Sequence, residues 1–195
     1  VYRENDGIAF MISILLTTCG GIMFRMLGRE AGNNLNRRDA FLVVTAAWVI
    51  FSFFGMFPFL FSGYITNFTD AYFETMSGFT TTGATIFDDV EQLPHGLLFW
   101  RSLTQWIGGM GIIVLSIAIL PIFGLNGMQL YAAEVTGLTY EKLSPRISDT
   151  AKLMWTTYIV LTAIEILALW LCGMELFDAI CHSFSTIATG GFSTK

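Results

Sequence analysis

The chain has 195 residues, of which 54% are hydrophobic and only 13% are charged, and its formal net charge is −5. Soluble domains carry about 25% charged residues, so this composition excludes an ordinary soluble protein and indicates a membrane protein. There is no basic patch interleaved with aromatic residues, so the chain is not predicted to bind nucleic acid. It has two histidines and neither an HExxH nor a GxSxG motif, so it is not predicted to be an enzyme.

Four segments are apolar over the length of about 20 residues that crosses a bilayer as a helix. They are residues 8–24, 40–62, 96–123 and 151–171. Two further apolar stretches, residues 68–87 and 176–194, follow the second and the fourth span and are rich in Thr and Gly. Because they are too polar and too glycine-rich for a helix that faces lipid, we expect each to begin as a short helix and then turn back.

The basic residues predict the orientation of these spans. Arginines cluster in residues 25–39, and Lys142 and Arg146 lie in residues 125–150. Loops rich in Lys and Arg stay in the cytoplasm. We therefore expect a multi-pass membrane protein with both basic loops in the cytoplasm and both re-entrant stretches opening to the outside.

The two re-entrant stretches align with each other at a constant spacing. Asp70 aligns with Asp178, Thr81 with Thr189 and Gly83 with Gly191. The repeated unit is a helix, a pore loop and a helix. We expect residues 1–38 to form a preceding transmembrane helix and a cytoplasmic loop, residues 39–146 the first repeat, and residues 147–195 a second repeat that stops after its loop.

A physical argument connects these loops with cations. Irregular backbone at membrane depth is tolerated where it lines a water-filled cavity, and its carbonyl groups can replace the water around an ion. Asp70 and Asp178 lie at the N-termini of the short helices, whose C-termini carry partial negative charge toward the loops. The predicted selectivity filter comprises Thr81, Thr82, Gly83, Ala84, Thr189, Gly190, Gly191 and Phe192, and a dehydrated cation is expected on the carbonyls of Thr81, Thr82, Thr189 and Gly190. The alternative is Thr/Gly packing between helices.

Four other features near the loops call for an interpretation. Glu74 either attracts cations or braces the first loop, and His182, which aligns with Glu74, is predicted to brace the second. Arg101 is expected to extend to the membrane surface. The glycines of residues 108–111 are expected to let helices approach closely behind the loops.

The motifs TTTGAT at residues 80–85 and ATGGFST at residues 188–194 resemble the first two filter loops of the Trk/Ktr/HKT superfamily of cation transporters. Supporting runs are LPH at residues 93–95, QWIGGMG at 105–111, AILPI at 118–122 and GMQLY at 127–131. The resemblance covers nearly the whole chain. It is closest to the bacterial potassium-uptake membrane subunits of that superfamily.

The resemblance implies an all-α membrane protein with four potassium-channel-like repeats around a pseudo-fourfold axis, of which this N-terminal-half fragment supplies two. It also implies that K⁺ is the transported ion and binds to the four carbonyls named above, with no cofactor in this chain. The expected location is the lipid bilayer of a bacterial cytoplasmic membrane, where the protein forms a homodimer. The expected partner is a cytoplasmic nucleotide-binding regulatory subunit of the TrkA type. Glycine at Gly83 and Gly191 favours potassium, since serine at the first such position accompanies sodium transport in related plant proteins. A non-conducting membrane scaffold subunit and an ion-coupled secondary transporter of a small solute are the alternatives.

Overall fold

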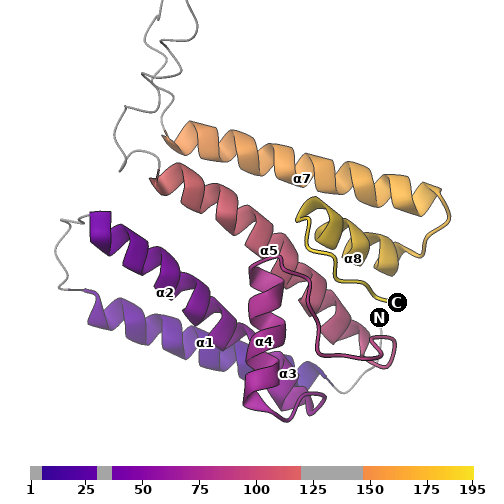
Figure 1. Cartoon of the computed structure of the whole chain (residues 1–195), viewed down its shortest axis with the longest axis horizontal. Coiled ribbons are helices and arrows are strands. Elements are labelled where there is room, and N and C mark those ends of the chain that lie inside the picture. The colour runs from indigo at the N-terminus through magenta and orange to yellow at the C-terminus, as the bar shows by residue number, and fades with distance from the viewer. Residues whose placement is uncertain (1–5, 30–36, 120–146) are drawn as a thin grey trace, which may run out of the picture.

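The computed structural model describes residues 6–29, 37–119 and 147–195, and the regular secondary structure within these ranges is helical throughout. The helices, labelled in Figure 1, are α1 Gly7–Leu27, α2 Arg37–Gly55, α3 Phe57–Ser62, α4 Phe68–Phe79, α5 His95–Ile119, α7 Ile147–Leu171 and α8 Leu176–Ile187. The two short helices predicted before the Thr/Gly motifs correspond to α4 and α8. The predicted all-α fold is confirmed for the described residues.

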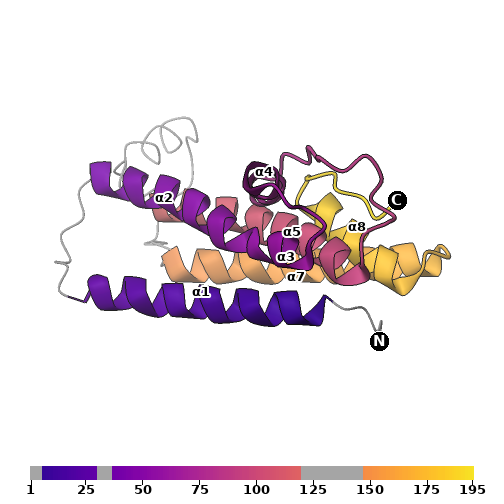
Figure 2. The same ribbon diagram turned by 90° about the horizontal axis from the view of Figure 1, so that it is seen from below.

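The long helices α1, α2, α5 and α7 run roughly alongside one another, as Figures 1 and 2 show. The short helices α4 and α8 both pack against α5, and α8 also packs against α7. The chain that follows each short helix lies at the same end of the bundle (Figure 2). Both Thr/Gly stretches therefore open on one face, as the sequence predicts.

Three helices in the described ranges are long and apolar enough to cross a membrane: Gly7–Leu27, Phe41–Ser62 and Lys152–Leu171. They match three of the four predicted spans. The remaining predicted span corresponds to α5, and its predicted end at Phe123 lies outside the described residues, as do Lys142 and Arg146. The predicted boundary between the two repeats, after residue 146, is therefore still a prediction.

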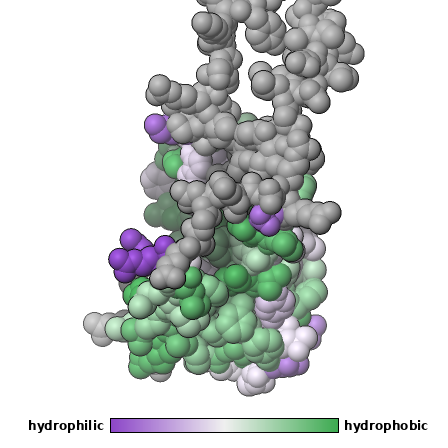
Figure 3. Space-filling model, turned by 90° about the vertical axis from the view of Figure 1, so that its left-hand side faces the viewer, coloured by the Kyte–Doolittle hydropathy of each residue, from purple (hydrophilic) through white to green (hydrophobic). Residues whose placement is uncertain are grey.

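The outer faces of these helices are apolar. Large hydrophobic side chains such as Ile8 and Met11 on α1 and Leu161 on α7 are exposed. Figure 3 shows one face of the molecule on which hydrophobic residues predominate. A soluble monomer rarely exposes an apolar surface of this extent, whereas lipid covers it at no cost in hydration.

The second span is interrupted near its C-terminal end. α2 ends at Gly55, and α3 begins at Phe57 with a proline, Pro58, in its first turn. Proline has no N–H to continue the helical ladder. The N–H of Phe59, which would bond to the carbonyl of Gly55 in an unbroken helix, bonds to that of Met56 at 3.1 Å. The carbonyl of Gly55 accepts a hydrogen bond of 2.9 Å from the indole N–H of Trp100 on α5. The break therefore leaves no unpaired carbonyl at Gly55, and this hydrogen bond fixes the end of the second span to α5.

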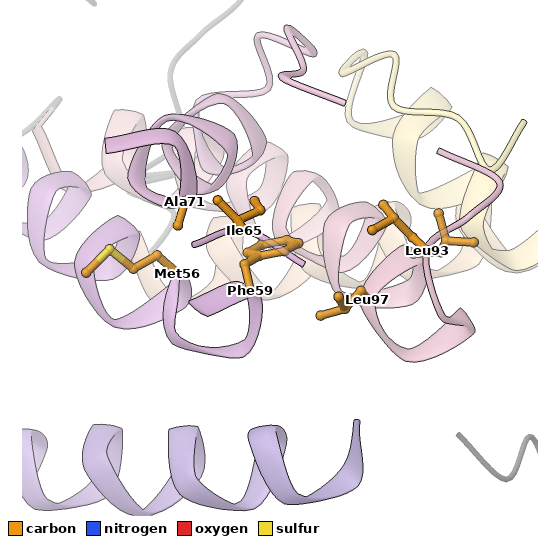
Figure 4. Packing of buried hydrophobic residues seen from close by; sticks show 7 residues of the cluster. Met56, Phe59, Ile65, Ala71, Leu93 and Leu97 are labelled. Carbon is orange, nitrogen blue, oxygen red and sulfur yellow. The ribbon is translucent and has the colours of Figure 1, made fainter. Parts of the chain in front are cut away.

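A buried cluster holds α3 and the starts of α4 and α5 together. It consists of Met56, Phe59, Ile65, Ala71, Leu93, Leu97 and Leu98, most of which are labelled in Figure 4. The residues come from the α2–α3 junction, α3, the first turn of α4, the first turn of α5 and the segments just before α4 and α5. Their close packing stabilises the folded state through van der Waals contacts. This packing sets the point at which α4 enters the bundle.

Candidate functional site

The short helix α4 leads into the first loop, which we define as residues 80–87. The helix is capped at its N-terminus by Asn67, whose side-chain oxygen accepts a hydrogen bond of 3.1 Å from the backbone N–H of Thr69. Asp70 lies in the first turn of α4, and Asp178 lies in the first turn of α8. A carboxylate there is favourable because the N-terminus of a helix carries partial positive charge.

The short helix α8 leads into the second loop, residues 188–195, and the two loops share an unusual backbone. Thr81 has φ +56° and its aligned counterpart Thr189 has φ +55°. Positive φ in a β-branched residue is a genuine outlier, with a cost of about 1–3 kcal/mol. Gly83 and Gly191 follow with φ +76° and +89°, so each loop has positive φ at two matching positions that are two residues apart. Strain repeated at matching positions points to a functional requirement.

The N–H groups of both loops point back to the short helices. Thr81 and Thr82 donate to the carbonyls of Gly78 and Ser77 at 3.0 and 2.9 Å, and Thr189 and Gly190 donate to those of Thr186 and Ser185 at 2.9 and 2.8 Å. Alternation of left- and right-handed residues places successive N–H groups on one side of the chain. The carbonyl groups of Thr81, Thr82, Thr189 and Gly190 accept no hydrogen bond from any described residue.

The two loops touch at their glycines. The α-carbon of Gly83 lies so close to the carbonyl oxygen of Gly190 that a β-carbon at Gly83 would overlap it. A β-carbon at Gly191, in contrast, would meet no atom within 4 Å. The two glycines are therefore equivalent in backbone conformation and different in surroundings.

Beyond Gly83, the carbonyl of Ala84 accepts a hydrogen bond of 2.6 Å from the hydroxyl of Ser77. Of the predicted filter residues in the first loop, Ala84 is thus the one whose carbonyl is held by a side chain of α4. The carbonyls of Thr81 and Thr82, which accept no hydrogen bond from a described residue, come before Gly83 in the loop. The carbonyl that follows Gly83, that of Ala84, is occupied by Ser77.

Glu74 on α4 braces the first loop. It is 1% exposed, and its carboxylate accepts hydrogen bonds of 3.0 Å from the Thr85 hydroxyl and of 3.0 Å from the Ile86 N–H. Its ion pair with Arg101 on α5 has an N–O distance of 2.8 Å. Of the two roles open at the sequence level, the structure supports bracing, because the carboxylate is buried and fully engaged.

Arg101 contradicts the expectation that it extends to the membrane surface. It is 2% exposed, and besides Glu74 it donates hydrogen bonds to the Thr85 hydroxyl at 3.1 Å and to the Ser193 carbonyl at 3.2 Å. Its guanidinium carbon lies 4.2 Å from the centroid of the Phe192 ring. The side chain stays buried because the ion pair and these three further groups replace its hydration.

The second loop has its own braces. The side-chain oxygen of Gln105 accepts a hydrogen bond of 3.1 Å from the Phe192 N–H, and His182 lies 3.2 Å from the Thr194 hydroxyl. The contact of His182 confirms its predicted bracing role. Gln105 was not predicted as a site residue. A polar side chain on the same helix face as Arg101, four residues away, is the signal that would have identified it.

Asp178, predicted at the start of the second short helix, is bound to the end of the chain described here. It accepts a hydrogen bond of 2.9 Å from the Thr194 hydroxyl, and its other oxygen lies 3.0 Å from the Lys195 ammonium group. Burial acts to raise the pKa of the Asp178 carboxyl, but the hydrogen bonds from Lys195 and Thr194 outweigh it and keep the pKa below its ordinary value.

The glycines of α5 allow the close approach that the sequence predicts. A β-carbon at Gly108 would overlap the carbonyl of Phe79, where α4 ends. One at Gly109 would lie 3.0 Å from the β-carbon of Ala188, where α8 ends. Consecutive residues of α5 thus contact the ends of both short helices.

Apolar outer faces, spanning helices and a paired strained backbone together define a multi-pass, all-helical membrane protein. The sequence comparison is specific about its family. Residues 6–195 match the family TrkH, described as a cation transport protein, and the chain belongs to this family. The recognition made from the Thr/Gly motifs is thereby confirmed.

Relatives in several bacteria are similar over essentially the whole chain. The Trk system potassium uptake proteins TrkH and TrkG of Escherichia coli K12 are 48% and 42% identical to it over 100% and 99% of its length. The crystal structure of the potassium transporter TrkH from Vibrio parahaemolyticus covers 100% of the chain with a TM-score of 0.84 and 42% identity. The chain spans 41% and 40% of these two E. coli proteins and 38% of the crystallised chain.

Proposed function

We propose that the complete protein takes up potassium across the cytoplasmic membrane, and that this chain supplies two of the four strands of its selectivity filter. The observation that carries the proposal is the matched backbone of the two loops. Thr81 and Thr189 share a positive φ, and the carbonyls at and just after these threonines are left without a hydrogen-bond partner among the described residues.

Unpaired carbonyls on strained backbone suit a dehydrated cation. Each carbonyl oxygen carries partial negative charge and replaces one water of the hydration shell, and several aligned carbonyls favour K⁺. The four proposed ligands are the carbonyl oxygens of Thr81, Thr82, Thr189 and Gly190. The short helices add to this because their C-terminal ends, with partial negative charge, lead into the loops. Every contribution has the sign that attracts a cation.

The family supports the rest of the proposal. The relatives are named potassium uptake proteins of a Trk system. By that similarity we propose residues 39–146 and 147–195 as two pore repeats, the second one truncated, within a pseudo-fourfold protein. A homodimer and a cytoplasmic nucleotide-binding regulatory subunit belong to the same proposal.

The alternative functions predict other features. A solute transporter needs a roomy polar site near the middle of the membrane. The cavity of about 590 Å³ between α1, α2, α4 and α5 is lined almost wholly by apolar side chains such as Phe54, Phe79 and Trp100. A non-conducting scaffold gives no reason for two threonines to adopt a strained conformation. Neither alternative is favoured by a described feature.

The test uses the full-length protein in cells that lack other potassium uptake. Growth at low potassium and rubidium uptake are compared for the wild type, Gly83→Ser and Gly191→Ser at equal amounts in the membrane. We expect both substitutions to change uptake or the preference for K⁺ over Na⁺. Wild-type rates and ion preference in both variants would show that the filter assignment is wrong.

A further inference from the structure

We propose that Arg101 is a positioning residue that fixes the distance between the two loops and thereby sets the discrimination between K⁺ and Na⁺. The inference rests on the proposed function, because it assigns to Arg101 the placement of the carbonyls that form the filter. Arg101 itself is not one of the residues whose carbonyls are proposed to bind the ion. It acts through Thr85 and Ser193, which follow those residues in the two loops.

The geometry joins the two loops through one side chain. On the first loop, Arg101 contacts the Thr85 hydroxyl directly and pairs with Glu74, which holds the same hydroxyl. On the second loop, it donates to the Ser193 carbonyl and lies over the Phe192 ring. Thr85 and Ser193 occupy matching positions in the sequence alignment of the two loops. Arg101 therefore connects equivalent points of two strands.

The chemistry of the side chain explains why arginine is suited to this position. The planar guanidinium has five N–H donors in a fixed fork and stacks on aromatic rings, whereas lysine offers a single ammonium group on a flexible stem. Nε is used by Glu74, and the two terminal nitrogens are used by Ser193 and Thr85. A lysine could retain the charge beside Glu74 but could not reach both loops at once.

The distance between the loops matters because they already touch. The Gly190 carbonyl packs directly on the α-carbon of Gly83, one residue after the free carbonyl of Thr82. A small change in the separation of the strands would change the spacing of the carbonyls around an ion. Cavity size and the number of coordinating carbonyls are the two properties from which K⁺/Na⁺ selectivity arises.

The experiment measures K⁺ uptake, its KM and maximal rate, and the inhibition by Na⁺ in full-length wild type and Arg101→Lys. We expect Arg101→Lys to lower the preference for K⁺ over Na⁺ by about tenfold and to change KM more than the maximal rate. The matched control is Arg25→Lys, since Arg25 is exposed in the last turn of α1 and should behave as wild type. Arg101→Lys with a preference within about twofold of wild type would overturn the inference.

A second pair keeps the test decisive if Arg101→Lys does not accumulate in the membrane. Thr85→Val removes the hydroxyl that Arg101 and Glu74 share, and Thr85→Ser retains it. We expect Thr85→Val to lose several-fold of the K⁺ preference and Thr85→Ser to keep it. Equal preference in the two variants would overturn the inference. The proposed function would still stand in that case if Gly83→Ser alters uptake, and it would fall separately if both glycine variants match wild type.

Discussion

The first and second loops have the same backbone and different supports. Thr81 and Thr189 agree in φ within one degree, and their N–H groups bond to equivalent carbonyls at the ends of α4 and α8. The first loop is held by the buried carboxylate of Glu74, and the second by the side chains of Gln105 and His182, while Arg101 contacts both loops. The backbone conformation is thus the property that both loops share, while each loop achieves it with the side chains available nearby.

The largest expected difference between the loops is at their glycines. Gly83→Ala combines a strained left-handed residue, at about 1–2 kcal/mol, with overlap of the new methyl group on the Gly190 carbonyl. Gly191→Ala has the strain alone, because its surroundings are open. Rubidium uptake should fall by about a hundredfold or more in Gly83→Ala and by about tenfold in Gly191→Ala.

Both glycine variants of the full-length protein are compared at equal membrane abundance, measured by immunoblot. Similar losses in the two would contradict the asymmetry described here. A larger loss in Gly191→Ala would reverse it and would indicate that another part of the complete protein packs against Gly191.

The next difference is between the ion pair of Glu74 with Arg101 at the first loop and the hydrogen bond of His182 at the second. Glu74→Gln leaves Arg101 buried without a counter-charge, and breaking a buried ion pair in this way costs about 3–5 kcal/mol. His182→Leu removes one hydrogen bond to Thr194, which is worth about 1 kcal/mol. Thermal unfolding of the purified protein in detergent should therefore show a much larger decrease in midpoint for Glu74→Gln.

The wild type and both variants are measured in the same detergent and salt. If His182→Leu lowered the midpoint as much as Glu74→Gln, the ion pair would not be the dominant support of the first loop. The comparison of the loops would then have to rest on their hydrogen bonds alone.

The smallest expected difference is between two aligned serines. Ser77 donates to the Ala84 carbonyl, whereas the hydroxyl of Ser185 is buried without a partner among the described residues. Ser77→Ala should lower stability by about 1 kcal/mol, and Ser185→Ala should be neutral or slightly stabilising because it removes an unsatisfied polar group. The same thermal assay separates the two, and a clear loss in Ser185→Ala would reveal a partner for its hydroxyl.

The sequence predicted the loops well because their signal is local. Threonine and glycine at membrane depth are unusual, and the alignment of Asp70 with Asp178 and of Gly83 with Gly191 doubles that signal. The structure places α4 and α8 where these motifs predict short helices. Their roles as filter strands stay a proposal.

The buried contacts of Arg101 with Glu74 and Ser193 could not be predicted in the same way. Arg101 is separated from Glu74 by 27 residues and from Ser193 by 92, so the contacts depend on how α5 packs between α4 and α8. Hydropathy assigns an arginine near a helix end to the membrane surface, and only the position of the facing carboxylate reverses that assignment. The break at Pro58 is different, because the proline is visible in the sequence. The span predicted for residues 40–62 nevertheless continued through it.

The supporting residues of α5 occupy a single face of that helix. Arg101, Gln105 and Gly108 are spaced by four and three residues, and together they serve the first loop, the second loop and the end of α4. α5 lies within the proposed first repeat, yet Arg101 and Gln105 on this face contact the second loop. The repeats are therefore not interchangeable modules. A chimera that exchanges one of them with a relative will keep its pore only if α5 and both loops come from the same parent.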